Sequence, residues 1–191
     1  MKNNWLNTKA IKYIKHYKKL GFSEDMALRV YTTRLLGRNP ELVLHGGGNT
    51  SVKTTVRDVD GKNYKVLCVK GSGWDMAEIE PAGLPAVKLE PLLAFKNKKN
   101  LSDEDMVAYQ KKNLIDIKSP NPSVETFLHA FLPFKFVDHT HSDAIMNVTN
   151  RPNGVQFCKK IFGKKVSIVP YVMPGFGLAK KIQEVYSKNP N

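Results

Sequence analysis

The sequence predicts an α/β fold in a single domain, and three observations support this prediction. The chain has 191 residues, of which 41% are hydrophobic, and this is the size of one domain with a substantial core. Apolar residues recur at helical spacing near both ends of the chain. Between these segments lie short β-prone runs, two of which adjoin glycine-containing loops. Helices and strands are therefore both expected to build the core.

The N-terminal segment, residues 1–23, contains six lysines and no acidic residue. Ala10, Ile11, Ile14 and Tyr17 recur at helical spacing, which predicts a basic amphipathic helix preceding a domain at 24–191. The helix could dock on the body of the protein or meet an anionic surface, and we favour docking.

Serine residues predict where two further helices begin. Ser23 is followed by two acidic residues, as an N-cap often is, and opens a helix that ends near Gly37. Ser102 is followed by three acidic residues and opens another helix. The remaining predictions are a loop with one short helix at 81–98, helices at 143–150, 152–162 and 178–186, and a strand at 166–169.

Charge and cysteine content limit the function classes. Basic residues outnumber acidic ones by 30 to 17, a net charge of +13, which suggests an anionic partner. The lysines are scattered or terminal and no nucleic-acid-binding motif is present, so nucleic acid is disfavoured. The charge could equally be a solvated surface that also attracts a phosphorylated metabolite. Cys68 and Cys158 lie in apolar surroundings without ligand spacing, which predicts buried reduced thiols and a cytoplasmic protein. No stretch approaches membrane-spanning length, so no membrane association is expected.

A glycine-rich loop at 46–48 is the first candidate binding element. It is expected to connect a strand at 42–44 to a strand at 54–56. Glycines allow successive backbone N–H groups to point inward and hold an anion. Asn49, Thr50 and Ser51 could add side-chain donors, and Lys53 could add charge. The alternative is a hairpin turn that binds nothing.

A second loop of small residues follows the predicted strand 64–69. It contains Gly71, Ser72 and Gly73, whose backbone N–H groups and hydroxyl suit a phosphate. Two such loops, each next to a strand, are more informative than either one.

The central motif combines a carboxylate with two histidines. Phe136 and Val137 predict a short strand, and His139 and His141 lie two residues apart in extended chain, so they point the same way. Two imidazoles on one face can begin a divalent-metal site. Glu125, expected in the first turn of a helix opened by Pro122 and Ser123, could ligate the metal or carry protons. On spacing alone, the histidines could equally be only hydrogen-bonded or solvated. His129, one helical turn after Glu125, is interpreted as a neighbouring or core histidine.

Three motifs occur in order: LHGGGNTSVK at 44–53, VKGSGWD at 69–75 and NPSVETFLHAFLPFKFVDHTHSDAI at 121–145. Over residues 24–180 the chain resembles the class II aldolase/adducin family. Within it, the chain is most similar to the aldolase module of bifunctional rhamnulose-1-phosphate aldolase/short-chain dehydrogenase proteins. The resemblance implies a three-layer α/β/α domain with a mainly antiparallel central sheet, assembled as a homo-oligomer, usually a tetramer.

The resemblance also implies roles for individual residues. His139 and His141 match two of the three histidines that bind Zn²⁺ or another divalent metal. Glu125 matches the catalytic residue that exchanges protons with the substrate. The positions expected to bind the substrate phosphate are Gly48, Asn49, Thr50, Ser72, Gly73 and Ser123.

The implied activity is that of a zinc-dependent lyase. It cleaves a phosphorylated deoxyketose such as rhamnulose 1-phosphate into dihydroxyacetone phosphate and an aldehyde. Alternatives are a pentulose-phosphate 4-epimerase of the same family and a non-catalytic, adducin-like binding or assembly module. The third zinc histidine belongs to a downstream His-Gly segment that has no counterpart before Asn191. The expectation is therefore a domain without its C-terminal part, which is complete only with a partner chain or is no longer catalytic.

Overall fold

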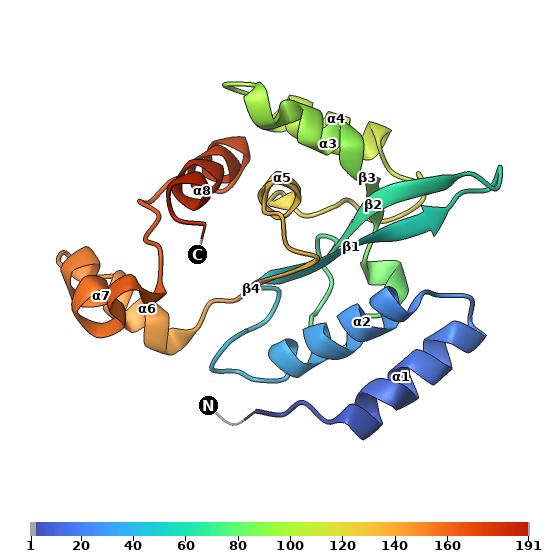
Figure 1. Ribbon diagram of the computed structural model, residues 1–191, viewed down its shortest axis with the longest axis horizontal. Helices are drawn as coiled ribbons and strands as arrows, with labels where there is room; N and C mark the ends of the chain where they lie inside the picture. The colour runs from blue at the N-terminus through green and yellow to red at the C-terminus, as the bar shows by residue number, and fades with distance from the viewer. Residues whose placement is uncertain (1–2, 191) are drawn as a thin grey trace.

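A four-stranded antiparallel sheet lies at the centre of the computed structural model, which describes residues 3–190 (Figure 1). The strands are β1 (Asn49–Arg57), β2 (Asn63–Val69), β3 (Ala86–Lys88) and β4 (Phe136–His139), in the order β3-β2-β1-β4. In this register Asn49 lies opposite His139, and Val69 lies opposite Ser51. The ends of β1, β2 and β4 that carry the predicted site residues therefore meet at one edge of the sheet.

One face of the sheet is covered by α2 (Glu24–Gly37), with α1 (Asn7–Lys19) packed outside it (Figure 1). Helix α2 begins as predicted, because the Ser23 hydroxyl accepts the backbone N–H of Met26. Helix α1 buries Tyr17, whose hydroxyl donates to Glu80 at 2.6 Å. The core on this side includes Val30, Val52, Val66 and Cys68. In residues 3–190 no helix combines the length and apolar character needed to cross a membrane.

The other face packs against α3 (Leu89–Ala94), α4 (Asp103–Lys112), α5 (Thr126–Phe131) and α8 (Phe176–Lys188). Phe127 of α5 is fully buried, with its ring centroid 5.3 Å from that of Phe176 and 5.8 Å from that of Phe131. Edge-on aromatic contacts of this kind stabilise a core beyond the area they bury. The molecule thus has helices on both faces of an antiparallel sheet, which confirms the predicted three-layer α/β/α fold.

The α6–α7 arm, residues 143–165, is set apart from these layers (Figure 1). It contains α6 (Asp143–Thr149), α7 (Gly154–Phe162) and a 3₁₀ turn at Gly163–Lys165. Two further 3₁₀ turns lie at Pro81–Gly83 and Phe95–Asn97. The helices predicted after Ser102, at 143–150, at 152–162 and at 178–186 are all confirmed, with boundaries shifted by a few residues.

Two predicted strands are absent from the part of the chain that the structure describes, and a third begins earlier than predicted. Residues 42–44 continue the turn after α2, because the N–H groups of Leu42 and Val43 both bond to the carbonyl of Asn39. The strand expected at 54–56 begins at Asn49, so β1 includes the polar triplet assigned to the loop. Residues 166–169 form no strand within the described residues, since no neighbouring strand pairs with them. Strand β3, only three residues long and flanked by prolines in the sequence, was missed.

Candidate active site

A cleft of about 360 Å³ opens where β1 begins and β4 ends. This volume suits a small phosphorylated molecule. Four segments that are distant in the sequence line it, namely Gly46–Asn49, Lys70–Gly73, Ser123–Glu125 and the pair His139 and His141, together with Pro174. The two glycine loops, the carboxylate and the histidines therefore share one space, as the sequence predicted.

Asn49 lies at the centre of the polar contacts in this cleft. Its side-chain amide donates to the Glu125 carboxylate at 2.6 Å and to the Ser123 hydroxyl at 2.8 Å. Its Oδ1 lies 2.6 Å from Nε2 of His129. Because a buried amide with partners on both its nitrogen and its oxygen has one favourable orientation, the Asn49 side chain is fixed.

Glu125 lies immediately before α5 and is 8% exposed. Its carboxylate accepts the Asn49 amide and lies 2.8 Å from Nδ1 of His139. Burial raises the pKa of Glu125, but the hydrogen bonds from His139 and Asn49 lower it below its ordinary value. Glu125 is therefore an ionised carboxylate facing the cleft, able to accept a proton.

His139 and His141 point toward each other, with their Nε2 atoms 3.1 Å apart. Nδ1 of His139 faces Glu125, so the two Nε2 atoms meet on the side of that ring away from the carboxylate. The N–H of His141 donates to the carbonyl of Leu42 at 2.9 Å, which holds the chain after β4 against the turn that follows α2. Two imidazole nitrogens that meet at one point can share a proton or bind a cation.

The glycines of the two loops have different tasks. Gly48 has φ +69°, and a Cβ there would lie 2.6 Å from the carbonyl oxygen of His139, so β1 and β4 approach closely only because the residue is glycine. In the second loop, the Ser72 N–H donates to the carbonyl of Asn121 at 2.9 Å. Gly73 has φ +83° with open space around its Cβ position. The first loop brings the strands together, and the second opens toward solvent.

Comparison with known proteins identifies the family. The family model described as Class II Aldolase and Adducin N-terminal domain matches residues 27–191 of this chain. The chain belongs to the class II aldolase/adducin family. A solved structure of the N-terminal class II aldolase domain of a conserved protein from Thermoplasma acidophilum is 43% identical, with a TM-score of 0.84. That similarity covers 99% of this chain and 82% of the other.

A second relative is the uncharacterized oxidoreductase YuxG of Bacillus subtilis (strain 168). It is 44% identical over 162 residues, which are 85% of this chain and 24% of YuxG. The chain therefore spans about a quarter of the length of this curated relative.

Class II aldolases generally depend on a divalent metal, and the histidine pair can be tested for its fit to one. Two imidazole nitrogens, each about 2.0–2.1 Å from a tetrahedral zinc ion, lie about 3.3 Å apart. The 3.1 Å separation of the His139 and His141 Nε2 atoms is close to this value. Glu125 contacts the other nitrogen of His139, as carboxylates that orient metal-binding histidines do. Residues 3–190 contain no group of three or more His, Cys, Asp or Glu side chains placed to hold a metal. The pair thus fits two ligands of such an ion.

Three sequence-predicted residues do not reach the cleft. Ser51 is fully buried, and its hydroxyl lies 2.8 Å from Nδ1 of His129. Thr50 is fully buried, and its hydroxyl lies 2.7 Å from that of Thr33 on α2. Strand alternation explains this, since Asn49 and Thr50 must point to opposite faces of the sheet. The Lys53 ammonium donates to the carbonyls of His129 and Phe134 at the end of α5, so it supports a helix terminus. The other proposed phosphate-binding residues, Gly48, Asn49, Ser72, Gly73 and Ser123, all line the cleft.

Lys70 lines the cleft and was not chosen from the sequence. It is 5% exposed, and burial lowers its pKa while the charge of Asp75 opposes this shift. Its position as the last residue before the Gly71–Gly73 loop, directly after a buried strand, was the signal that could have identified it.

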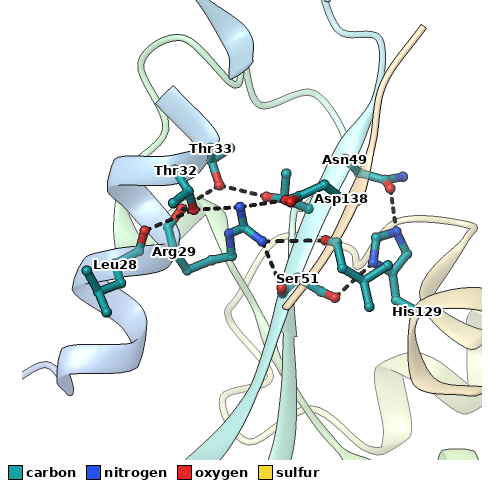
Figure 2. Close-up of polar contacts among 10 residues, drawn as sticks. Leu28, Arg29, Thr32, Thr33, Asn49, Ser51, His129 and Asp138 are labelled. Atoms are coloured by element: carbon teal, nitrogen blue, oxygen red, sulfur yellow. Dashed lines mark hydrogen bonds and ion pairs between the residues drawn. The ribbon is translucent and has the colours of Figure 1, made fainter. Parts of the chain in front are cut away.

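Arg29 was also missed, and it supports the two site strands from the opposite face of the sheet (Figure 2). It is fully buried on α2, with Nη1 donating to the carbonyls of Ser51 at 3.1 Å and Val137 at 3.5 Å. Its Nη2 lies 2.6 Å from the Asp138 carboxylate. Burial lowers the pKa of Arg29, and the charge of Asp138 opposes this. One buried cation thus contacts both β1 and β4 just inside the cleft.

Proposed function

We propose that this chain is the catalytic domain of a metal-dependent aldolase. The reaction is cleavage of a phosphorylated deoxyketose, such as rhamnulose 1-phosphate, into dihydroxyacetone phosphate and an aldehyde. The observation that carries the proposal is the position of the Glu125 carboxylate. It lies between a histidine pair suited to a metal and two loops suited to a phosphate, in one cleft.

The phosphate end of the substrate would be held by the second loop and its neighbours. The Ser72 hydroxyl and the Gly73 N–H offer donors, since the Gly71 and Ser72 N–H groups bond to the carbonyls of Gly83 and Asn121, and Lys70 adds positive charge. Ser123 lies between this loop and Glu125 and can contact the same ligand. Anchoring the end of the molecule that does not react holds the bond to be broken near the carboxylate, which lowers the entropic part of the barrier.

Glu125 would move the protons. In the cleavage direction, the hydroxyl on C4 loses its proton, the C3–C4 bond breaks, and C4 becomes the aldehyde carbonyl. The bonding electron pair remains on C3, which takes up a proton to complete dihydroxyacetone phosphate. An ionised carboxylate at this position can receive the first proton, and its protonated form can deliver a proton to C3. Asn49 holds the carboxylate in place between these steps.

His139 and His141 would hold the divalent ion, which supplies Lewis-acid stabilisation of the negative charge that develops on the substrate oxygens. We also propose that the domain works in a homo-oligomer, as is common in the family.

The experiment measures exchange and cleavage in parallel. In D₂O with added Zn²⁺, the wild-type chain should replace the C3 proton of dihydroxyacetone phosphate with deuterium, and ¹H NMR monitors this exchange. It should also cleave rhamnulose 1-phosphate. Glu125→Gln should lower both rates by about 10²- to 10⁴-fold, since it removes a general acid–base. Glu104→Gln, at an exposed position on α4, is the matched control and should leave both unchanged.

Each other outcome has a defined meaning. Interconversion of pentulose phosphates epimeric at C4, without net cleavage, would assign the domain to the 4-epimerases. A chain that shows neither reaction with Zn²⁺, Mn²⁺ or Co²⁺ overturns the proposal in favour of a non-catalytic module.

A further inference from the structure

His129 is a buried histidine that the proposed chemistry does not use. It lies on α5, is 0% exposed, and contacts two residues of β1 through its ring nitrogens (Figure 2). Nε2 lies 2.6 Å from Oδ1 of Asn49, and Nδ1 lies 2.8 Å from the Ser51 hydroxyl. Burial lowers its pKa to about 3, so the ring is neutral at ordinary pH. A neutral imidazole carries one proton, and its position decides what each contact can be.

The Asn49 amide decides which nitrogen carries that proton. Its NH₂ group is directed at the Glu125 carboxylate, which only accepts hydrogen bonds. Its carbonyl oxygen must therefore face His129, and at 2.6 Å this oxygen needs a donor. Hence Nε2 of His129 carries the proton, and Nδ1 accepts the Ser51 hydroxyl. The Lys53 ammonium holds the backbone carbonyl of the same histidine at 2.8 Å, which keeps the ring in register with β1.

The reverse orientation of the amide is unfavourable. A half-turn of the Asn49 side chain would place its carbonyl oxygen against the Glu125 carboxylate, so two acceptors would meet at hydrogen-bond distance. The donor from His129 stabilises the orientation that avoids this contact. We propose that His129 is a positioning residue, which uses its Nε2–H to fix the Asn49 amide and thereby holds Glu125 in the cleft.

This inference deepens the proposed function, and its kinetic consequences rest on that function. Two variants separate hydrogen bonding from packing. Glutamine is long enough to place an amide N–H near the Nε2 position, whereas asparagine reaches only the Nδ1 position. His129→Gln can therefore still donate to Asn49, while His129→Asn keeps a polar contact with Ser51 and loses the donor.

The kinetic test compares these variants in the deuterium exchange assay. His129→Asn should lower kcat by about 10- to 100-fold with KM changed by less than about threefold, as expected for loss of a residue that orients a catalytic group. His129→Gln should recover kcat to within about fivefold of wild type. Equal losses in both variants, at equal melting temperatures, would indicate a packing role and overturn the proposal.

NMR provides a test that does not depend on activity or on the folding of the variants. Long-range ¹H–¹⁵N spectra of the wild-type chain should show His129 as the neutral Nε2–H tautomer from pH 5 to 8. The Asn49 NH₂ signals should be shifted and protected from solvent exchange. An Nδ1–H tautomer or a charged ring overturns the inference, whatever the enzyme assay shows. A wild-type chain with the expected NMR signature but no exchange activity would contradict the proposed function and leave the positioning role supported.

Discussion

Two parts of the molecule, the edge of the sheet that carries the cleft and the α6–α7 arm, are stabilised in opposite ways. The edge of the sheet that carries the cleft buries polar and charged side chains, including Arg29 and His129, both fully buried and both hydrogen-bonded. The α6–α7 arm leaves apolar side chains in solvent, with Val155 53% and Ile161 55% exposed. Helix α6 has no buried residue, and α7 buries only Gly154 and Cys158.

This contrast shows which part of the molecule tolerates few alternative side-chain arrangements. Buried polar groups are costly unless each finds its partner, so the cleft edge can adopt very few arrangements. The arm packs mainly on itself, through α6, α7 and the 3₁₀ turn that follows, and makes few contacts with the layers. Substitutions at the cleft edge should therefore change stability and chemistry together, whereas substitutions in the arm should change little.

Removal of the buried guanidinium should have the largest effect. Arg29→Met leaves the carbonyls of Ser51 and Val137 without their donor and Asp138 without its partner. The free energy of unfolding should fall by about 3 kcal/mol, measured by urea denaturation. Arg57→Met, at an exposed position of the β1–β2 hairpin, is the control and should change it by less than about 0.5 kcal/mol. Similar losses in the two variants would show that Arg29 is not a structural support.

A pair of glycine substitutions compares the two regions directly. Gly48 and Gly163 both have positive φ, but only at Gly48 would a new Cβ meet neighbouring backbone, 2.6 Å from the His139 carbonyl oxygen. Gly163→Ala should incur backbone strain alone, whereas Gly48→Ala should also push β4 away from β1. Thermal unfolding should show Gly48→Ala to be less stable than Gly163→Ala by about 1–3 kcal/mol. The prediction fails if the arm variant is the less stable one.

The pH dependence of stability should report His129. Its pKa is about 3 in the folded protein against 6.5 in the unfolded chain, so between these values the unfolded state binds one more proton. Stability should therefore be greatest above about pH 6.5 and decline below it, by up to about 1.4 kcal/mol per pH unit from this group. His129→Gln should remove that part of the slope in urea titrations between pH 4.5 and 6.5. An unchanged slope would mean that the folded protein can protonate His129.

The smallest effect is expected in the arm. Ile161→Ala removes an exposed side chain and should change the free energy of unfolding by less than about 0.5 kcal/mol. Leu67→Ala, at a fully buried position of β2, should cost about 3 kcal/mol under the same conditions. A large loss for Ile161→Ala would show that the arm is covered in solution, for example in an oligomer.

Features that depend on neighbouring residues could be predicted from the sequence. Ser23 and Ser102 begin helices because each caps an N–H group three residues later. The shared direction of His139 and His141 follows from the alternation of extended chain. The position of Glu125 in the same cleft followed from the ordered motifs and the family resemblance they carry.

Features that depend on distant residues could not be predicted. Nothing local distinguishes Arg29 from a surface arginine, because its burial requires β1 and β4 to lie beneath α2. The same holds for Thr50, whose partner Thr33 belongs to another layer. The exact start of β1 was needed to decide which face each residue of the Asn49–Lys53 segment would meet, and the glycines before it concealed that start.

Alternate residues of strand β1 contact different layers of the molecule. Asn49 and Ser51 contact residues of the cleft and of α5, whereas Thr50 and Val52 contact α2. A single substitution alters the contacts on one face of the strand and leaves those on the other face intact. An insertion or deletion of one residue between Gly48 and Thr54 would exchange the two faces for the residues on one side of the change. In evolution this segment should therefore accept substitutions but not insertions or deletions. Insertion scanning of the gene should find it the least tolerant stretch of the chain.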